Sequence, residues 1–117
     1  MIGNREKPKI RNAVIVDTFL GIEDHGIMTC WITLDYGGGS RQGFGGFILD
    51  TFDKLQDRRV GTSFGMSFIM RILEMVGVTR WEDLKGKHVR AKVTYEKIHA
   101  IGHIVEDKWF EPDKEKL

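Results

Sequence analysis

A glycine-rich segment, GGGSRQGFGG at residues 37–46, contains the residue types that a nucleotide ligand requires. Glycine lets the backbone adopt positive φ and approach a ligand closely. Between the glycines stand Arg41, Gln42 and Phe44, which could bind phosphate, bind a base edge and stack on a base. The segment matches neither a dinucleotide fingerprint nor a phosphate-binding P-loop. The same glycines are also typical of a flexible hairpin tip or of a kinked strand in a strongly curved sheet.

A second candidate site is the polar side of a hairpin expected over residues 87–105. With a two-residue turn at 96–97, alternate side chains of its two strands face opposite sides. The apolar side then carries Val89, Ala91, Val93, Ala100, Gly102 and Ile104, and the polar side carries His88, Arg90, Lys92, Thr94, His99 and His103. Arg90 could form a bidentate contact with phosphate, supported by Lys92 and His103. The alternative is an ordinary solvated face of a sheet.

Patterns for catalysis, metal binding and cofactor binding are absent from the sequence. There is no Walker loop, HExxH, nucleophile elbow, EF-hand or kinase signature. Cys30 is the single cysteine and falls on the apolar side of an expected strand, where a thiol is inert. His99 and His103 would lie roughly 13 Å apart along a strand, and His25 beside two carboxylates lacks a third ligand. We therefore expect a protein that is not an enzyme and holds neither a metal nor a cofactor.

The three tryptophans favour structural roles more than ligand contacts. Trp31 falls on the polar side of an expected strand, Trp81 follows a helix cap, and Trp109 follows the last expected strand. Tryptophan in such places more often covers part of the core or a sheet edge than it stacks on a ligand. Trp109 together with Phe110 could close the end of a barrel or form a subunit contact.

The elements that must position these residues follow from the spacing of apolar residues. Strands are expected at 10–20, 27–36 and 47–49, with the glycine segment as a wide turn and 50–60 as a connection. A helix is expected over 63–76, capped by Thr62 or Ser63 and ended by Gly77. A capping box, T-x-x-E at 79–82, opens a short turn, and strands at 87–95 and 98–105 follow. This order predicts an α+β fold, a five-stranded antiparallel curved sheet or small barrel with one main helix.

Composition narrows the function further. The 117 residues include 18 basic and 17 acidic ones, and a net charge of +1 argues against a strong nonspecific binder of long nucleic acid. The chain is expected to form a single domain over 1–117 with charged tails at 1–9 and 111–117. No apolar run approaches the roughly 20 residues that span a bilayer, and the polar N-terminus is no signal peptide. We therefore expect a cytoplasmic protein.

Three stretches, IEDHGIMTCWITLDYGGGSRQGFGGFILD, VGVTRWEDLKGKHVRAKV and IGHIVEDKWFEP, resemble small proteins of unknown function from bacteriophages and prophages. The resemblance covers about residues 10–112 and implies a phage gene product that acts in the bacterial cytoplasm. It assigns a role to no residue. The order of elements also resembles, in layout only, phage single-stranded-DNA-binding domains of the oligonucleotide-binding (OB) barrel type.

These patterns together predict a phage-type binding protein that binds or sequesters a compact, anionic, nucleotide-like ligand and so counters host defence signalling. The predicted ligand-binding residues are Arg41, Gln42, Phe44, Arg90, Lys92 and His103. Two alternatives stay open, a single-stranded nucleic-acid-binding protein and a protein-binding, anti-CRISPR-like inhibitor of a bacterial defence complex. Each is compatible with a homo-oligomer, because exposed sheet edges pair readily.

Overall fold

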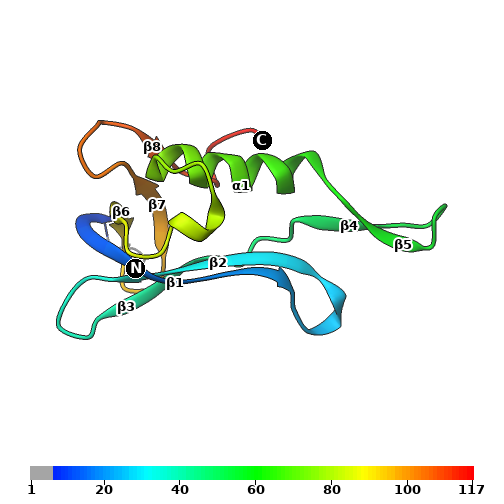
Figure 1. Ribbon diagram of the computed structural model, residues 1–117, viewed down its shortest axis with the longest axis horizontal. Coiled ribbons are helices and arrows are strands. Elements are labelled where there is room, and N and C mark those ends of the chain that lie inside the picture. The colour runs from blue at the N-terminus through cyan, green and yellow to red at the C-terminus, as the bar shows by residue number, and fades with distance from the viewer. Residues whose placement is uncertain (1–6) are drawn as a thin grey trace, which may run out of the picture.

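The computed structural model describes residues 7–117 and consists of one antiparallel sheet, one helix and one protruding hairpin (Figure 1). The six-stranded sheet has the order β3-β2-β1-β6-β7-β8. Its strands are β1 (Lys9–Ile22), β2 (Met28–Asp35), β3 (Arg41–Gly45), β6 (His88–Val93), β7 (Ile98–Gly102) and β8 (Trp109–Phe110). The hairpin pairs β4 (Asp50–Asp53) with β5 (Arg58–Gly61), and the helix is α1 (Ser63–Val76). Short 3-10 turns occupy Asp24–Gly26 and Trp81–Asp83.

The predicted α+β class and the main helix are confirmed, although the sheet has six strands rather than five. The side chain of Thr62 accepts a hydrogen bond from the backbone N–H of Gly65, which satisfies one donor of the first helical turn. Gly77 ends α1 in the left-handed conformation, with φ 87°, and donates its N–H to the carbonyl of Leu73. The apolar residues spaced at three and four then face the sheet.

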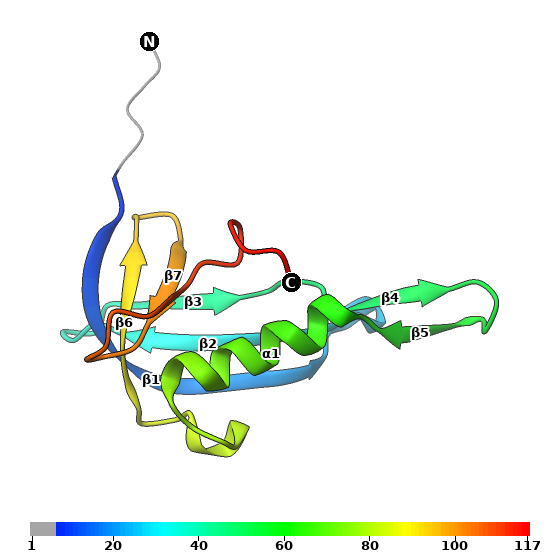
Figure 2. The ribbon, with the colours of Figure 1, turned by 90° about the horizontal axis from the view of Figure 1, so that it is seen from above.

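Strand β1 is long and serves two halves of the sheet. Residues 9–14 pair with β6, and residues 14–22 pair with β2, with a bulge between Ile15 and Asp17. A bulge bends a strand and increases its twist. The sheet face away from α1 is here called the outer face, and the bend divides it into two parts (Figure 2). The β1–β3 half is made by residues 17–22 with β2 and β3. The β6–β8 half is made by residues 9–14 with β6, β7 and β8.

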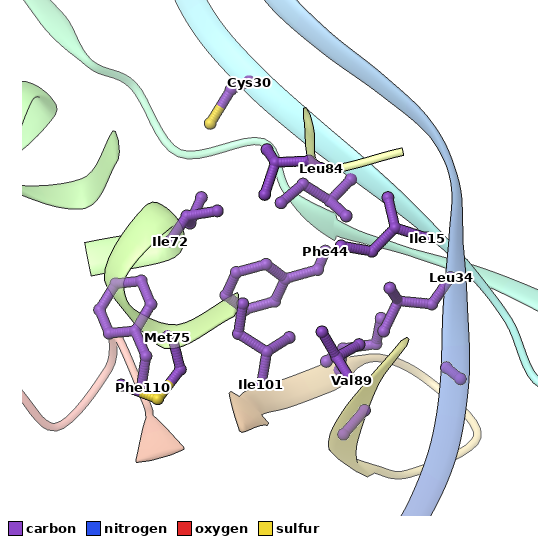
Figure 3. Packing of buried hydrophobic residues seen from close by; sticks show 14 of the residues in the cluster. Ile15, Cys30, Leu34, Phe44, Ile72, Met75, Leu84, Val89, Ile101 and Phe110 are labelled. Atoms are coloured by element: carbon purple, nitrogen blue, oxygen red, sulfur yellow. The ribbon is translucent and has the colours of Figure 1, made fainter. Parts of the chain in front are cut away.

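The core lies between the inner face of the sheet and α1 (Figure 3). Phenylalanine rings dominate its centre, where Phe44 of β3 lies 6.0 Å from Phe68 of α1 and 6.2 Å from Phe110 of β8, measured between ring centroids. Cys30 is buried as predicted, and burial raises the pKa of its thiol to about 12. The thiol therefore stays protonated at neutral pH and acts as a small apolar group.

The segment from 37 to 61 differs from its prediction. Strand β3 lies inside the glycine-rich segment, residues 47–49 form no strand, and the expected connection 50–60 is the β4–β5 hairpin. The hairpin is fixed at its base because the Arg59 guanidinium donates to both carboxylate oxygens of Asp50, at 2.7 and 2.8 Å. Asp50 Oδ1 also accepts the backbone N–H of Met28, which ties the hairpin to β2.

The register predicted for the last hairpin is also wrong, because its turn contains four residues, 94–97, rather than two. The backbone N–H of Thr94 closes this turn on the carbonyl of Lys97, and the register then shifts between Lys92 and Val93. Arg90 consequently pairs with Gly102, and Lys92 pairs with Ala100. The predicted apolar positions Ala100 and Gly102 thus belong to the outer face.

Two smaller expectations are corrected at the ends of elements. The 3-10 turn Trp81–Asp83 has Arg80 at its N-cap and no side-chain cap bond, so the predicted capping box does not form. The C-terminal residues 111–117 are no free tail, because Glu115 pairs with Arg71 and Asp113 pairs with Lys97. Of the predicted N-terminal tail, residues 1–6 lie outside the described residues, and Lys9 already begins β1.

Candidate ligand-binding site

Two aromatic residues are paired across neighbouring strands on the outer face of the β1–β3 half. Phe19 of β1 and Trp31 of β2 are directly opposite each other in the antiparallel pairing. Their exposed fractions are 42% and 38%, respectively. The Phe19 ring extends along its own strand over Gly21, where an added Cβ would lie 3.2 Å from its Cζ, and the Trp31 ring extends over β3. We call this pair the aromatic platform.

The glycines of β3 and its C-terminal end form the surface on which Trp31 lies. A Cβ at Gly43 would lie 3.1 Å from Cε3 of the indole, and one at Gly46 would lie 2.6 Å from its Cη2. A Cβ at Gly45 would collide with the carbonyl oxygen of Cys30. One face of the indole therefore rests on backbone, and its exposed surface is the opposite face and the edges.

The first glycines of the segment have a different role. Gly37, Gly38 and Gly39 have φ values of 99°, 64° and 84°, and a Cβ on any of them would meet nothing within 4 Å. They form the turn between β2 and β3, where positive φ favours glycine. The glycine-rich segment thus combines a turn with a floor for Trp31, and both of these roles are structural.

Groups of opposite charge flank the indole of Trp31. At one edge, in the β1–β2 loop (residues 23–27), Nε1 donates to Oε1 of Glu23 at 3.4 Å. At another side, a hollow of about 290 Å³ is lined by Trp31, the glycines of β3 and the β6–β7 turn, including both Glu96 and Lys97. The ammonium of Lys97 lies 2.9 Å from Asp113 and its side chain is 51% exposed. A group stacked on the indole would thus have the Glu23 carboxylate at one edge, and Glu96 together with Lys97 beside the hollow.

The predicted ligand residues of the glycine-rich segment have separate environments. Arg41 lies on the outer face with 58% of its side chain exposed and donates to Asp35 at 3.0 Å. Gln42 faces the inner side, where it accepts the hydroxyl hydrogen of Tyr36 at 2.6 Å and donates to the carbonyl of Thr94 at 3.0 Å. Of these two residues, only Arg41 directs its polar group toward solvent.

Phe44 requires a correction, because it is only 2% exposed and lies in the aromatic core. Strand β3 begins at Arg41, and alternate residues then face the inner side, so position 44 contributes to the core. No base can stack on this ring in the folded protein. The partly exposed ring next to the glycine-rich segment is that of Trp31.

The remaining predicted residues meet at the other end of the sheet, around Trp109. The guanidinium of Arg90 and the ammonium of Lys92 lie over the indole of Trp109, at 4.9 and 4.4 Å from the ring centroid. Arg90 also donates to the backbone carbonyls of His103 and Glu106, each at 2.8 Å. The structure therefore gathers Arg90, Lys92 and His103 into one cluster, apart from Arg41 and Gln42.

The ring of His103 in this cluster stabilises the β7–β8 loop. Its Nδ1 accepts the backbone N–H groups of Val105 and Glu106, at 3.1 and 2.9 Å. Because Nδ1 accepts two hydrogen bonds, the proton of the neutral ring is on Nε2. His99, which was expected on the same face as Thr94, contacts the hydroxyl of Thr94 at 3.0 Å.

Sequence reasoning missed the platform, although one signal for it was present. Trp31 alternates with Thr29, Thr33 and Asp35 on one side of β2, and a large ring among polar residues is unusual unless it covers something or binds something. Phe19 carries no such signal, because its partner across the strands depends on the β1 bulge.

Over residues 7–117, no three His, Cys, Asp or Glu side chains lie close enough together to hold a metal ion. In the same part of the chain, no helix is both long and apolar enough to cross a membrane.

Comparisons with known proteins found no similarity to this chain: no family model, no curated protein and no solved structure matches it. The resemblance to phage proteins therefore stays a prediction from sequence.

Proposed function

We propose that this protein binds single-stranded nucleic acid, without catalysing a reaction, on the outer face of the β1–β3 half. The observation that carries the proposal is the aromatic platform, two partly exposed aromatic residues opposite each other on neighbouring strands. Base–aromatic stacking is, together with cationic contacts to the phosphates, one of the two sequence-independent contacts of single-strand binders. The glycine floor adds to this, because a ring resting on backbone needs little further ordering when a base stacks on it.

The layout of the sheet supports the same proposal. We propose that strands β3-β2-β1-β6-β7, with α1 between β3 and β6, form an open variant of the OB-type sheet. In OB folds the oligonucleotide lies on the second and third strands, between the loop joining strands one and two and the loop joining strands four and five. The corresponding loops here are 23–27 and 94–97, and they carry the Glu23 and Lys97 that flank Trp31.

The charge distribution sets the expected strength and salt dependence of binding. Lys97 lines the hollow beside Trp31, and Arg41 lies on the same face at the far end of β3, opposite Asp35. Both cations are partly exposed, and each is already paired with an aspartate. Each contact between a cation and a phosphate of a single strand adds about −0.7 to the slope of the logarithm of the binding constant against the logarithm of the salt concentration. We therefore expect a total slope of about −1.4 at most, together with modest affinity.

A compact nucleotide-like ligand is the second candidate. The hollow of about 290 Å³ beside Trp31 and Lys97 favours it. Against it stands the separation of the six predicted ligand residues into a core residue, two β3 residues and the Trp109 cluster. A phage origin, a role against host defence and a protein target stay predictions, based on the resemblance of the sequence alone.

The test is fluorescence anisotropy with labelled mixed-sequence oligonucleotides of 4, 8 and 12 nucleotides, and with a labelled mononucleotide. We expect affinity to rise with length and to fall only weakly between about 50 and 300 mM salt. Trp31→Ala should weaken binding of the 12-mer by about 1 to 3 kcal/mol, the usual loss for one stacking ring. Phe52→Ala is the matched control, because Phe52 is a strand aromatic of similar exposure, 49%, on the β4–β5 hairpin.

The outcomes separate the two candidates. Equal affinity for the mononucleotide and the 12-mer, with a loss in Trp31→Ala, would select the compact ligand. Affinity that is unchanged by Trp31→Ala, or lowered as much by Phe52→Ala, would refute the platform as the binding site.

A further inference from the structure

We infer that Glu23 makes this site select bases that carry an exocyclic amino group, so that cytosine is bound better than uracil. The inference rests on the proposed function, because it concerns the same aromatic platform. It adds a property that the stacking rings alone do not provide, since every base has a π-face.

The position of Glu23 is the first step. Its Oε1 accepts the N–H of the Trp31 indole at 3.4 Å, so the carboxylate lies beside an edge of the ring and not over its face. This contact uses Oε1 and leaves Oε2 for a ligand. A base stacked on the indole extends past the ring edges, and its own edge then comes within reach of Oε2.

The second step is the orientation of the nucleotide. A carboxylate repels phosphate, while an ammonium attracts it. Glu23 contacts the indole from the β1–β2 loop, and the hollow at another side of the ring is lined by both Glu96 and Lys97. The sugar-phosphate backbone is therefore favoured away from Glu23, and the hydrogen-bonding edge of the base is favoured toward it.

The third step is the chemistry of the base edge. An ionised carboxylate is an acceptor only, so it requires a donor from the ligand. Cytosine presents its N4 amino group, which is the usual partner of Glu and Asp in base recognition. Uracil presents the O4 acceptor at the same position, and its N3–H lies between two carbonyl oxygens that the carboxylate repels. Cytosine and uracil otherwise have rings of the same size, so the comparison isolates the edge contact.

The experiment measures the affinities of labelled dC12 and dU12 for the intact protein and for two variants. The intact protein should bind dC12 about three- to tenfold better than dU12, the effect of one net hydrogen bond. Glu23→Gln should remove this preference, because an amide can both accept from N4 and donate to O4. Asp24→Asn changes the same charge in the same loop and should keep the preference.

Three results would overturn the inference. Equal binding of dC12 and dU12 by the intact protein, with both lost in Trp31→Ala, would remove the role of Glu23 and leave the proposed function intact. A preference that persists in Glu23→Gln, or that disappears equally in Asp24→Asn, would assign selectivity to another group or to loop charge alone. No binding of either oligonucleotide would refute the proposed function as well.

Discussion

Trp31 and Trp109 lie on the same face of one sheet, and each covers glycine, yet their surroundings differ. Trp31 rests on Gly43 and Gly46 in the β1–β3 half, and Trp109 covers Gly102 in the β6–β8 half. The indole N–H of each donates to a carboxylate, Glu23 for Trp31 and Asp107 for Trp109. Two cations lie over the ring of Trp109, whereas among residues 7–117 none lies over the ring of Trp31.

This difference separates a ring that stabilises the fold from a ring that is available to a ligand. One of these two cations, Arg90, also donates to the backbone carbonyls of His103 and Glu106 and so holds the β7–β8 loop. A cation over an indole fills the place that a base or a ligand cation would take. The aromatic surface of the β6–β8 half is thus already used within the chain, and that of the β1–β3 half is not.

The largest effect that follows is on stability. Trp109→Ala should lower the free energy of unfolding by about 3 kcal/mol, the lower end of the range for truncating a buried tryptophan. Trp109 belongs to β8 and covers Gly102, so its loss exposes both the strand and the loop before it. Trp31→Ala should cost less, about 1 to 2 kcal/mol, because 38% of Trp31 is already exposed in the folded protein. Urea denaturation of both variants measures the two losses.

Equal losses in the two variants would break the comparison, since Trp31 would then stabilise the fold as much as Trp109 does. A further control is oligonucleotide binding by folded Trp109→Ala, which should be little changed.

A smaller effect distinguishes the two cations over Trp109. Arg90→Ala leaves the carbonyl of His103 without its donor and leaves that of Glu106 with only the backbone N–H of Lys108, so it should cost about 1 to 3 kcal/mol. Lys92→Ala removes only the contact with the indole and should cost about 0.5 to 1 kcal/mol. Neither variant should weaken oligonucleotide binding if the platform is the site. A clear loss of binding in both variants would show that the ligand binds near Arg90 and Lys92, as the sequence predicted, and not at the platform.

The sequence predicted the elements whose boundaries are set by local chemistry. Thr62 and Gly77 mark the ends of α1 because a hydroxyl cap and a left-handed glycine are local requirements. Strand β3 could not be predicted, because its glycines are required by the ring of Trp31 on the neighbouring strand, which leaves no room for side chains there. The hairpin register was missed because the 94–97 turn and its bulge shift the pairing by one residue, and one residue exchanges the faces.

The candidate site was predictable only in part, for the same reason. Arg41, Arg90 and Lys92 were recognised by residue type, but residue type does not show which donors are already satisfied. Arg90 has backbone partners 13 and 16 residues away, which only the fold brings into reach. Phe44 was recognised as an aromatic ring among glycines, yet the strand period directs it into the core.

The smallest effect expected from the comparison is a response to acid at the β2–β3 turn of the β1–β3 half. The backbone N–H of Gly37, and then the guanidinium of Arg41, hold the pKa of Asp35 below its usual value. A carboxyl with a lowered pKa in the folded state stabilises the fold above its ordinary pKa of about 3.9, and this contribution is lost as pH falls through the lowered value. The contacts of Arg90 with Trp109 and with two carbonyls involve no titrating acid.

Acidification below about pH 4 should therefore loosen the β2–β3 turn before it affects these Arg90 contacts. Residue-resolved NMR is the appropriate measurement, because the pKa values of Asp50 and Asp53 are also lowered and would contribute to any global stability curve. The amide signal of Gly37 should shift, and its exchange with solvent should become less protected. Asp35→Asn should abolish the response at Gly37, since the amide does not titrate. A Gly37 signal that changes equally in Asp35→Asn would show that the turn responds to another group, and the acid response would then no longer distinguish the two halves of the sheet.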